Sequence, residues 1–229
     1  MIPAAAGVEA GATLLPGAGA EALALSVAAV PFAEMSGRYA VADYVRARAR
    51  LPQSAPGVEA LVAQPADFPY STTVWLFEQV RQICRDVGFL VAEFIDEGAC
   101  TPATCPRMQA TDKYLFKCAA HQGNKDCCAI DYAVHTLEGA VSLLNSPKAF
   151  PNNLDIKASN ITRFKTLVRR LYRVLAHAHF HHPAKFAAFE RRTWLCHRMH
   201  LICAKYALCP KEQMIIPRRA VAAIHADGE

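Results

Sequence analysis

The chain has 229 residues, 53% of them hydrophobic, and a formal net charge of +5. This length fits one domain plus a flexible end, or at most two small domains, and the composition supplies enough apolar side chains for a core. The weak positive charge does not by itself indicate nucleic-acid binding. Nine cysteines, an odd number in a chain of this length, argue against a secreted disulfide framework.

The first residues carry neither a recognisable export signal nor a membrane span. No Lys or Arg precedes the first apolar stretch, and that stretch contains Glu9 and Glu21. The longest apolar run, residues 22–33, is too short to cross a bilayer. We therefore expect a cytoplasmic protein with mostly reduced thiols. Residues 1–32, rich in Ala, Gly and Pro, are predicted to be a disordered tail, the alternative being a short helix over 20–30 that forms on a partner.

Amphipathic helices account for most of the remaining chain, because apolar residues recur at steps of three and four. The predicted helices cover residues 33–50, 71–97, 129–145, 160–180 and 185–207. Ser71 or Thr72 can cap the longest of them, and Ser159 or Asn160 the fourth. Several such helices with almost no strand signal predict an all-α helical bundle.

Three segments show no helical pattern. Residues 52–70 contain four prolines and are predicted to be a surface loop. Residues 99–128 hold five cysteines and two prolines, with a strand-like apolar run at 114–116. Residues 218–229 are expected to be a flexible tail, so the predicted domain spans 33–217.

Two segments far apart in the sequence carry residue types that bind zinc. Cys100 and Cys105 frame a short Thr-Pro-Ala-Thr loop, and a histidine-rich segment runs from His177 to His182. Thiolate and imidazole are the ligands that zinc prefers, and a structural site takes four of them in a tetrahedron. A zinc ion held by both segments would fasten the loop after the longest helix to the end of the fourth helix, and would stabilise the fold.

The spacing of the histidines leaves open which of them bind. His177 and His181 would face the same way on an unbroken helix, whereas His177 and His182 would lie about 140° apart. The second pair requires the helix to end or loosen between them, which Pro183 makes plausible. Other thiols and imidazoles are interpreted as core or surface residues: Cys118, Cys127, Cys128, His197 and His200.

Six segments, taken in their order and spacing, resemble the Mob/phocein family, and its phocein branch in particular. They are Cys-Thr-Pro-Ala-Thr-Cys (100–105), Cys-Ala-Ala-His (118–121), Ala-Ile-Asp-Tyr (129–132), His-Thr-Leu-Glu-Gly-Ala (135–140), Leu-Leu-Asn-Ser (143–146) and the Arg-Arg-Leu-Tyr to Phe-His-His run (169–182). The resemblance is strongest over residues 74–217, and the first thirty residues do not resemble the family's usual start. It implies a long-helix bundle with one structural zinc ion bound by Cys100, Cys105, His177 and His182.

The same resemblance implies a non-catalytic adaptor rather than an enzyme. The phocein branch implies partners in striatin-interacting phosphatase and kinase (STRIPAK-like) complexes: a striatin-like scaffold, protein phosphatase 2A subunits and germinal-centre kinases of the sterile-20-like type. The expected location is cytoplasmic, and peripheral association with Golgi or other membranes is left open. The alternative function is a Mob-type coactivator that binds NDR/LATS-type kinases directly.

Three arginines at positions i, i+1 and i+4, namely Arg169, Arg170 and Arg173, share one sector of the 160–180 helix. Guanidinium groups bind phosphate through two parallel hydrogen bonds, so the cluster is a candidate phosphopeptide site, with Lys165 as an outer member. The alternative is a solvated polar face. Basic residues at these positions resemble the family's pocket for phosphorylated Ser or Thr segments of upstream kinases.

Other functions find little support in the sequence. A zinc hydrolase would need an open metal position and a general base, and the glutamates nearest in sequence to the two segments, Glu97 and Glu190, belong to no recognised motif. A nucleic-acid-binding zinc finger would place its ligand pairs about a dozen residues apart, whereas Cys105 and His177 are separated by 72 positions. We find no catalytic triad signature and no Gly-rich phosphate loop.

Overall fold

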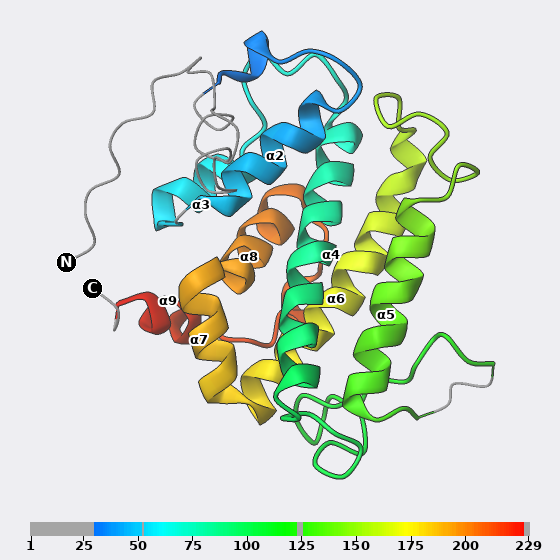
Figure 1. Ribbon diagram of the computed structural model, residues 1–229, viewed down its shortest axis with the longest axis vertical. Helices are drawn as coiled ribbons and strands as arrows, with labels where there is room; N and C mark the ends of the chain where they lie inside the picture. Colours follow the sequence, from blue (N-terminus) through cyan, green and yellow to red (C-terminus); the bar gives the residue numbers. More distant parts are fainter. Residues whose placement is uncertain (1–29, 52, 123–125, 227–229) are drawn as a thin grey trace.

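The computed structural model describes residues 30–51, 53–122 and 126–226. Within these ranges the chain forms eight α-helices and three short 3-10 helices, and no strand. The α-helices are α2 (Ala40–Arg50), α3 (Ala55–Val62), α4 (Thr72–Asp96), α5 (Ala129–Leu144), α6 (Ile161–His181), α7 (Pro183–Thr193), α8 (Leu195–Tyr206) and α9 (Arg218–Ala226). The 3-10 helices are η1 (Phe32–Glu34), η2 (Ala158–Asn160) and η3 (Lys211–Gln213). The predicted all-α fold is therefore confirmed (Figure 1).

The centre of the bundle consists of α4, α5 and α6, and α4 packs against both of the other two (Figure 1). α4 also contacts α2 and α8, so it touches helices on several sides. Its apolar residues recur every three or four positions, which buries Trp75, Phe77 and Phe94 almost completely. α4 is therefore the core helix that its sequence pattern predicts.

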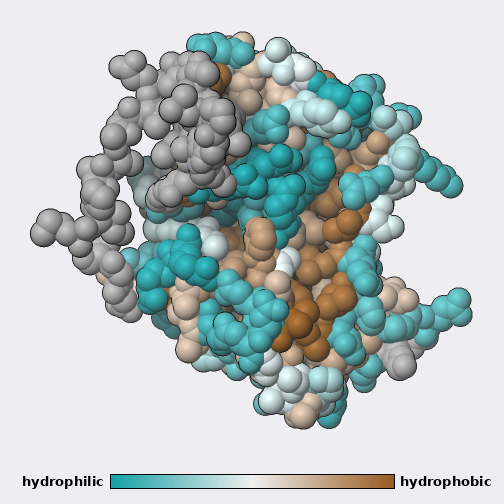
Figure 2. Space-filling view, in the orientation of Figure 1, coloured by the Kyte–Doolittle hydropathy of each residue, from teal (hydrophilic) through white to brown (hydrophobic). Residues whose placement is uncertain are grey.

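One face of the bundle keeps apolar side chains at the surface. Figure 2 shows them gathered where α4 and α5 run next to each other. Phe89 and Ile95 of α4 are 59% and 54% exposed, and Val141 of α5 is 49% exposed. A gathered group of this kind is typical of surfaces that a partner covers. No helix within the described ranges meets both the length and the hydropathy that crossing a bilayer requires.

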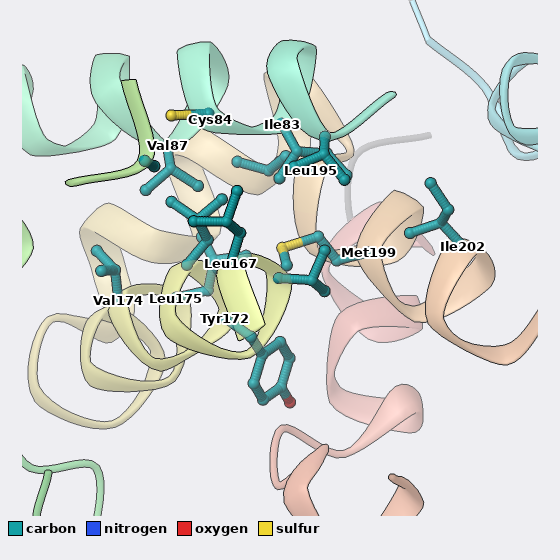
Figure 3. Packing of buried hydrophobic residues seen from close by; sticks show 14 of the residues in the cluster. Ile83, Cys84, Val87, Leu167, Tyr172, Val174, Leu175, Leu195, Met199 and Ile202 are labelled. Atoms are coloured by element: carbon teal, nitrogen blue, oxygen red, sulfur yellow. The ribbon is translucent and has the colours of Figure 1, made fainter. Parts of the chain in front are cut away.

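The hydrophobic core forms where α4, α6 and α8 meet (Figure 3). Ile83 and Val87 of α4, Leu167 of α6, and Leu195 and Met199 of α8 are each at most 4% exposed. Burying an aliphatic side chain of this size stabilises a fold by about 1.5–3 kcal/mol. This junction therefore fixes the positions of the three helices, and α6 carries both candidate sites described below.

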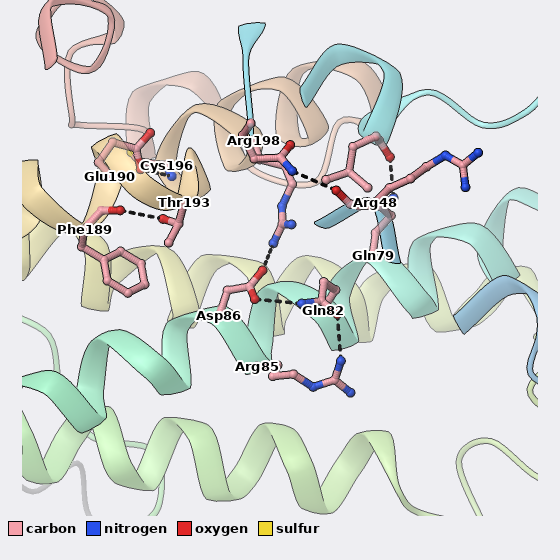
Figure 4. A network of polar contacts seen from close by, with 12 residues as sticks. Arg48, Gln79, Gln82, Arg85, Asp86, Phe189, Glu190, Thr193, Cys196 and Arg198 are labelled. Carbon is pink, nitrogen blue, oxygen red and sulfur yellow. Dashed lines mark hydrogen bonds and ion pairs between the residues drawn. The ribbon is translucent and has the colours of Figure 1, made fainter. Parts of the chain in front are cut away.

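A polar network crosses the same junction between α4 and α8 (Figure 4). Arg198 of α8 forms an ion pair with Asp86 of α4, and Gln82 donates a hydrogen bond to Asp86 at 2.8 Å. The Arg198 side chain is only 3% exposed, and that of Asp86 is 17% exposed. Because both charges are largely removed from water, the pair is sensitive to the loss of either partner.

Residues 185–207 lie in two helices rather than the single one predicted. α7 and α8 are separated by Trp194, which adopts a left-handed conformation with a φ of 52°. The carboxylate of Glu190 caps the start of α8, because it accepts hydrogen bonds from the backbone nitrogens of Cys196 (2.7 Å) and His197 (2.9 Å). The prediction of one helix is therefore wrong. The sequence does not indicate the break, because no glycine or proline stands at this position.

The proline-rich segment 52–70 contains a helix that the sequence analysis does not predict. α3 begins after Ser54, whose hydroxyl accepts a hydrogen bond from the backbone nitrogen of Gly57 at 3.3 Å. Pro56 lies in the first turn, where the missing N–H would have no helical partner anyway. The apolar side of α3 is buried and packs against α8. The prediction of a loop is therefore wrong for α3.

Residues at both ends of the described chain pack on the bundle. Residues 218–226 form α9, which packs on α7 and α8 and leaves Val221 only 1% exposed, so the prediction of a flexible tail is wrong for this segment. At the other end Phe32 is buried, and its ring centroid lies 5.3 Å from that of Tyr44. The predicted disordered tail otherwise falls on residues 1–29, which lie outside the described residues.

Candidate metal centre and basic pocket

A tight turn after α4 holds Cys100 and Cys105 on one side of the loop. Gly98 ends the helix with a positive φ of 59°, a conformation that glycine adopts without strain. The next turn is closed by Thr101 and Thr104, since the backbone nitrogen of each donates to the hydroxyl of the other, at 2.9 and 3.2 Å. These local hydrogen bonds explain how a four-residue spacer brings two thiols together.

The end of α6 shows which of the histidines lie close to the two thiols. His177 lies in the last part of the helix and is 3% exposed, whereas His182 follows the helix with φ and ψ of −132° and 54°. The chain leaves the helical path at His182, so its imidazole turns back toward that of His177. His181 remains exposed, although its ring stacks on His177 at 4.7 Å. The structure thus brings together His177 and His182, the pair that requires the helix to end.

Four side chains, two thiols and two imidazoles, converge between these segments. The Sγ of Cys100 lies 3.5 Å from the Nε2 of His177, and the Sγ of Cys105 lies 3.4 Å from the Nε2 of His182. All four ligand atoms lie within 4.8 Å of one another. A tetrahedral zinc ion with Zn–S near 2.3 Å and Zn–N near 2.0 Å holds sulfur and nitrogen roughly 3.5 Å apart. The donor set and its spacing therefore fit a single zinc ion.

The protonation state of His177 suits a cation, whereas that of the Cys100 thiol depends on one being bound. The Nδ1–H of His177 donates to the backbone carbonyl of Gln109 at 2.7 Å, which leaves the Nε2 lone pair directed at the cluster. Burial lowers the pKa of His177 to about 4, so the ring is neutral at neutral pH. Burial and the neighbouring Cys105 thiol raise the pKa of Cys100 to about 12. A cation between the thiols would reverse that preference and favour thiolates.

The cysteines and histidines interpreted from the sequence as core or surface residues divide into two groups. His200 is buried and His197 is half-buried on α8, and Cys128 is half-buried outside any cluster, in agreement with their interpretation as core or surface residues. Cys118 and Cys127 are buried, as that interpretation expects, but they also converge with two histidines in a second cluster. The signal for this cluster in the sequence is the spacing of Cys118 and His121, which are three positions apart, as metal-binding pairs often are.

The arginines of α6 reach a pocket of about 220 Å³ next to the loop that follows α4. Arg169 and Arg173 line this pocket, and Arg170 does not. The guanidinium carbon of Arg173 lies 4.8 Å from the ring centroid of Phe116, and its Nη1 donates to the hydroxyl of Tyr132 at 3.1 Å. Aromatic and tyrosyl contacts hold the Arg173 head in place while leaving donors free, which suits an anionic ligand.

Aromatic residues of a short hairpin form another wall of this pocket. Tyr114 and Phe116 line it, and the hairpin is held by an isolated bridge between Gln109 and Leu115. The backbone nitrogen of Phe116 also donates to the carbonyl of Met108 at 2.8 Å. The strand-like run predicted at 114–116 is thus one side of a hairpin rather than a strand of a sheet.

The two glutamates considered for a hydrolase have other partners. Glu190 uses both carboxylate oxygens to cap α8, and one of them also contacts the Nε2 of His225 at 3.2 Å. Glu97 forms an ion pair with Lys185. Neither belongs to the cluster of Cys100 and its partners, so the structure offers that cluster no general base from these residues.

Comparison with known proteins agrees with this architecture. The model of the Mob1/phocein family matches residues 51–217. MOB kinase activator-like 4 from Drosophila melanogaster is 41% identical over 187 residues, which cover 82% of this chain and 81% of the relative. MOB-like protein phocein from Caenorhabditis elegans is 40% identical over 167 residues, which cover 69% of this chain and 74% of the relative. The chain belongs to the Mob1/phocein family.

Proposed function

We propose that this protein is a non-catalytic adaptor, stabilised by zinc, that brings a phosphorylated protein segment to a larger assembly. The observation that carries this proposal is the pocket in which Arg169 and Arg173 face aromatic residues of the hairpin. The similarity to MOB-like protein phocein supports a striatin-type phosphatase and kinase complex as that assembly. The partners would then be a striatin-like scaffold, protein phosphatase 2A subunits and germinal-centre kinases.

The zinc ion in this proposal has a structural role. Cys100, Cys105, His177 and His182 would supply all four ligands, which leaves no position for a water molecule or a substrate. A metal bound in this way contributes directly to the stability of the fold. It would fix the loop after α4 against the end of α6, and so hold the hairpin over the pocket.

The basic pocket has the chemistry expected for a phosphate group. Two guanidinium groups one helical turn apart offer forked donors that match phosphate oxygens, and charge-assisted hydrogen bonds of this kind are among the strongest in proteins. The phenyl ring of Phe116 and the phenol of Tyr114 would cover the apolar part of a neighbouring side chain. A phosphorylated Ser or Thr with a flanking apolar residue would satisfy both parts.

The apolar face over α4 and α5 supports a second contact with a protein partner. A groove between these helices is lined by Leu137, Val141 and Leu144 of α5 and by Cys84 and Gly88 of α4, and its polar lining is Arg81, Arg85 and Asn145. The basic pocket and this groove are built from different residues. An adaptor requires at least two separate binding surfaces, which is what these two regions would provide.

Calorimetric titration with phosphopeptides tests the proposal. Because the two guanidiniums would bind the phosphate, Arg169→Glu combined with Arg173→Glu should leave the circular dichroism spectrum unchanged and abolish binding. The matched control is Arg191→Glu combined with Arg219→Glu, which changes the charge equally at exposed positions outside the pocket. Binding of phosphorylated peptides that survives the first double substitution would contradict the assignment of this pocket.

The similarity to MOB kinase activator-like 4 of Drosophila melanogaster favours one alternative, direct activation of a protein kinase. Affinity purification of the tagged full chain followed by mass spectrometry separates the two functions. Recovery of striatin and phosphatase subunits would support the scaffold function, whereas recovery of NDR/LATS-type kinases without them would support the alternative. The Arg169→Glu and Arg173→Glu variant serves as the control for contacts that depend on the pocket.

A further inference from the structure

A second group of thiols and imidazoles lies beside the start of α5. Cys118, His121 and Cys127 come from the loop between α4 and α5, and His135 comes from the second turn of α5. Their ligand atoms, one from each residue, all lie within 4.8 Å of one another. None of the four belongs to the cluster at the end of α6 or lines the basic pocket.

The distances within this second group match those of a metal site. The Nε2 of His121 lies 3.1 Å from the Sγ of Cys127. The Nδ1 of His135 lies 3.6 Å from the Sγ of Cys118 and 3.8 Å from that of Cys127. These values scatter about the separation of roughly 3.5 Å that tetrahedral zinc imposes on sulfur and nitrogen ligands. The two imidazole rings are nearly perpendicular, at 85°, with centroids 4.8 Å apart.

Ordinary packing explains this arrangement poorly. Cys118 and Cys127 are buried, but His121 and His135 are only half-buried and point ring nitrogens inward, where an apolar core would gain nothing from them. The described residues around the cluster, 119, 120, 122 and 126, are exposed, and Lys117 forms an ion pair with Asp126 at 2.7 Å. A loop that buries so little apolar surface needs another source of stability.

We propose that Cys118, His121, Cys127 and His135 form a second structural zinc site, which fastens the loop before α5 to the first turns of that helix. Both thiols would lose their protons to solvent on binding, and the four protein ligands would fill the tetrahedron. Two sulfurs and two imidazole nitrogens select zinc over the hard cations magnesium and calcium, which prefer oxygen.

The second site is joined to the first cluster through the backbone. The nitrogen of Ala129, the first residue of α5, donates to the carbonyl of Cys105 at 3.0 Å. The nitrogen of Met108 donates to the carbonyl of Cys127 at 3.2 Å. A ligand of each cluster therefore takes part in a hydrogen bond that crosses the loop. Two metal ions would therefore stabilise this loop, one near its start after α4 and the other near its end before α5.

Counting metal ions on the untagged full-length chain tests the site. Native mass spectrometry, supported by elemental analysis, should show two zinc ions per chain in the wild-type protein. Cys118→Ser should retain a single ion. The matched control Cys128→Ser should retain both ions, because Cys128 directly follows the ligand Cys127 in the sequence but lies outside the cluster. If Cys118→Ser does not fold, His121→Gln at the half-buried edge of the cluster provides the same test, with a single ion expected.

Three results would overturn the proposal. The first is a wild-type chain with one zinc ion, and the second is a Cys118→Ser variant that keeps two. The third is a wild-type chain lighter by two hydrogens because Cys118 and Cys127 have formed a disulfide. The count does not depend on phosphopeptide binding, since both ions could be bound while the basic pocket fails to bind phosphopeptides.

Discussion

The Nδ1 of His177 lies 2.7 Å from the backbone carbonyl oxygen of Gln109. This hydrogen bond joins the end of α6 to the hairpin, because Gln109 also pairs with Leu115. The ring of Phe116, which follows Leu115 in the hairpin, lies under the guanidinium of Arg173 in α6. The candidate metal centre and the basic pocket therefore share one loop, and disturbance of the first is expected to reach the second.

Replacement of a thiol in the first cluster should destabilise the whole domain. Cys105→Ser would remove one zinc ligand, and the expected loss is about 3 kcal/mol or more, which corresponds to a decrease in Tm of about 10 °C for a chain of this size. Differential scanning calorimetry with zinc analysis measures both effects. Cys84→Ser is the control, since Cys84 is a buried thiol of the core outside both clusters. A Cys105→Ser variant that keeps its zinc content and Tm would refute the ligand assignment.

A buried histidine outside the clusters should make stability depend on pH. Burial and the nearby charge of Arg218 lower the pKa of His200 to about 4, whereas the unfolded chain has an ordinary histidine pKa near 6.5. Between these values the unfolded state binds a proton that the folded state does not, so the free energy of unfolding falls as the pH decreases from about 6.5 to about 4.

Urea denaturation of the wild type and of His200→Gln measures this effect. Between about pH 7 and about pH 5, the wild type should lose about 2 kcal/mol more than the variant. The zinc ligands are the same in both proteins, so their own protonation cancels in the comparison. Equal losses in the two proteins would show that His200 does not carry the pH dependence.

The long helices could be predicted from the sequence because a continuous apolar stripe defines them. α4 and α6 begin and end within one or two residues of their predicted limits. The pattern fails where one residue decides the backbone. Trp194 takes a left-handed conformation without being glycine, and Pro56 looks like a helix breaker although it lies in a first turn. Tertiary contacts of α8 override these local preferences, and no single window of sequence contains them.

The candidate sites show the same limit. The residue types alone predict a zinc site with Cys100, Cys105 and histidines at the end of α6. The spacing does not show whether His181 or His182 joins His177. That choice depends on the dihedral angles at His182, where the helix ends. The second cluster cannot be predicted from pair spacing alone. Its ligands come from a loop and from a helix, so no familiar spacing joins Cys127 to His135.

The buried ion pair between α4 and α8 should be costly to break. Asp86→Ala would leave Arg198 charged and only 3% exposed, and removal of one partner of such a pair typically costs about 3–5 kcal/mol. Replacement of both partners by apolar residues, as Asp86→Leu with Arg198→Met, should cost less than Asp86→Ala alone. Chemical denaturation gives the three free energies of unfolding.

The control for this series is Asp155→Ala, because Asp155 is exposed and forms no ion pair among the described residues. Its effect should stay within about 0.5 kcal/mol. If Asp86→Ala proves as harmless as Asp155→Ala, the pair contributes nothing to the packing of α4 on α8. If the double variant is the least stable of all, the ion pair itself adds to the stability of the fold. The cost of Asp86→Ala would then not come only from leaving Arg198 without its partner.

The arginines of α6 should differ in their contribution to phosphopeptide binding. Arg169 lines the pocket and Arg170 does not, because adjacent residues of a helix point about 100° apart. We expect Arg169→Gln to weaken binding at least tenfold, as the loss of a charge-assisted hydrogen bond of about 1.5–3 kcal/mol implies. Arg170→Gln, a change of the same charge and size, should weaken binding by less than about threefold through the general field alone.

Isothermal titration with one phosphopeptide at two salt concentrations separates these effects. The small contribution of Arg170 should disappear at high salt, because charges that do not touch the phosphate act through solvent and are screened beyond about one Debye length. The contribution of Arg169 should persist, since a direct contact in a half-enclosed pocket is screened less. Equal losses for the two variants, with equal salt dependence, would mean that the peptide lies across the outer surface of α6 and not in the pocket lined by Arg169 and Arg173.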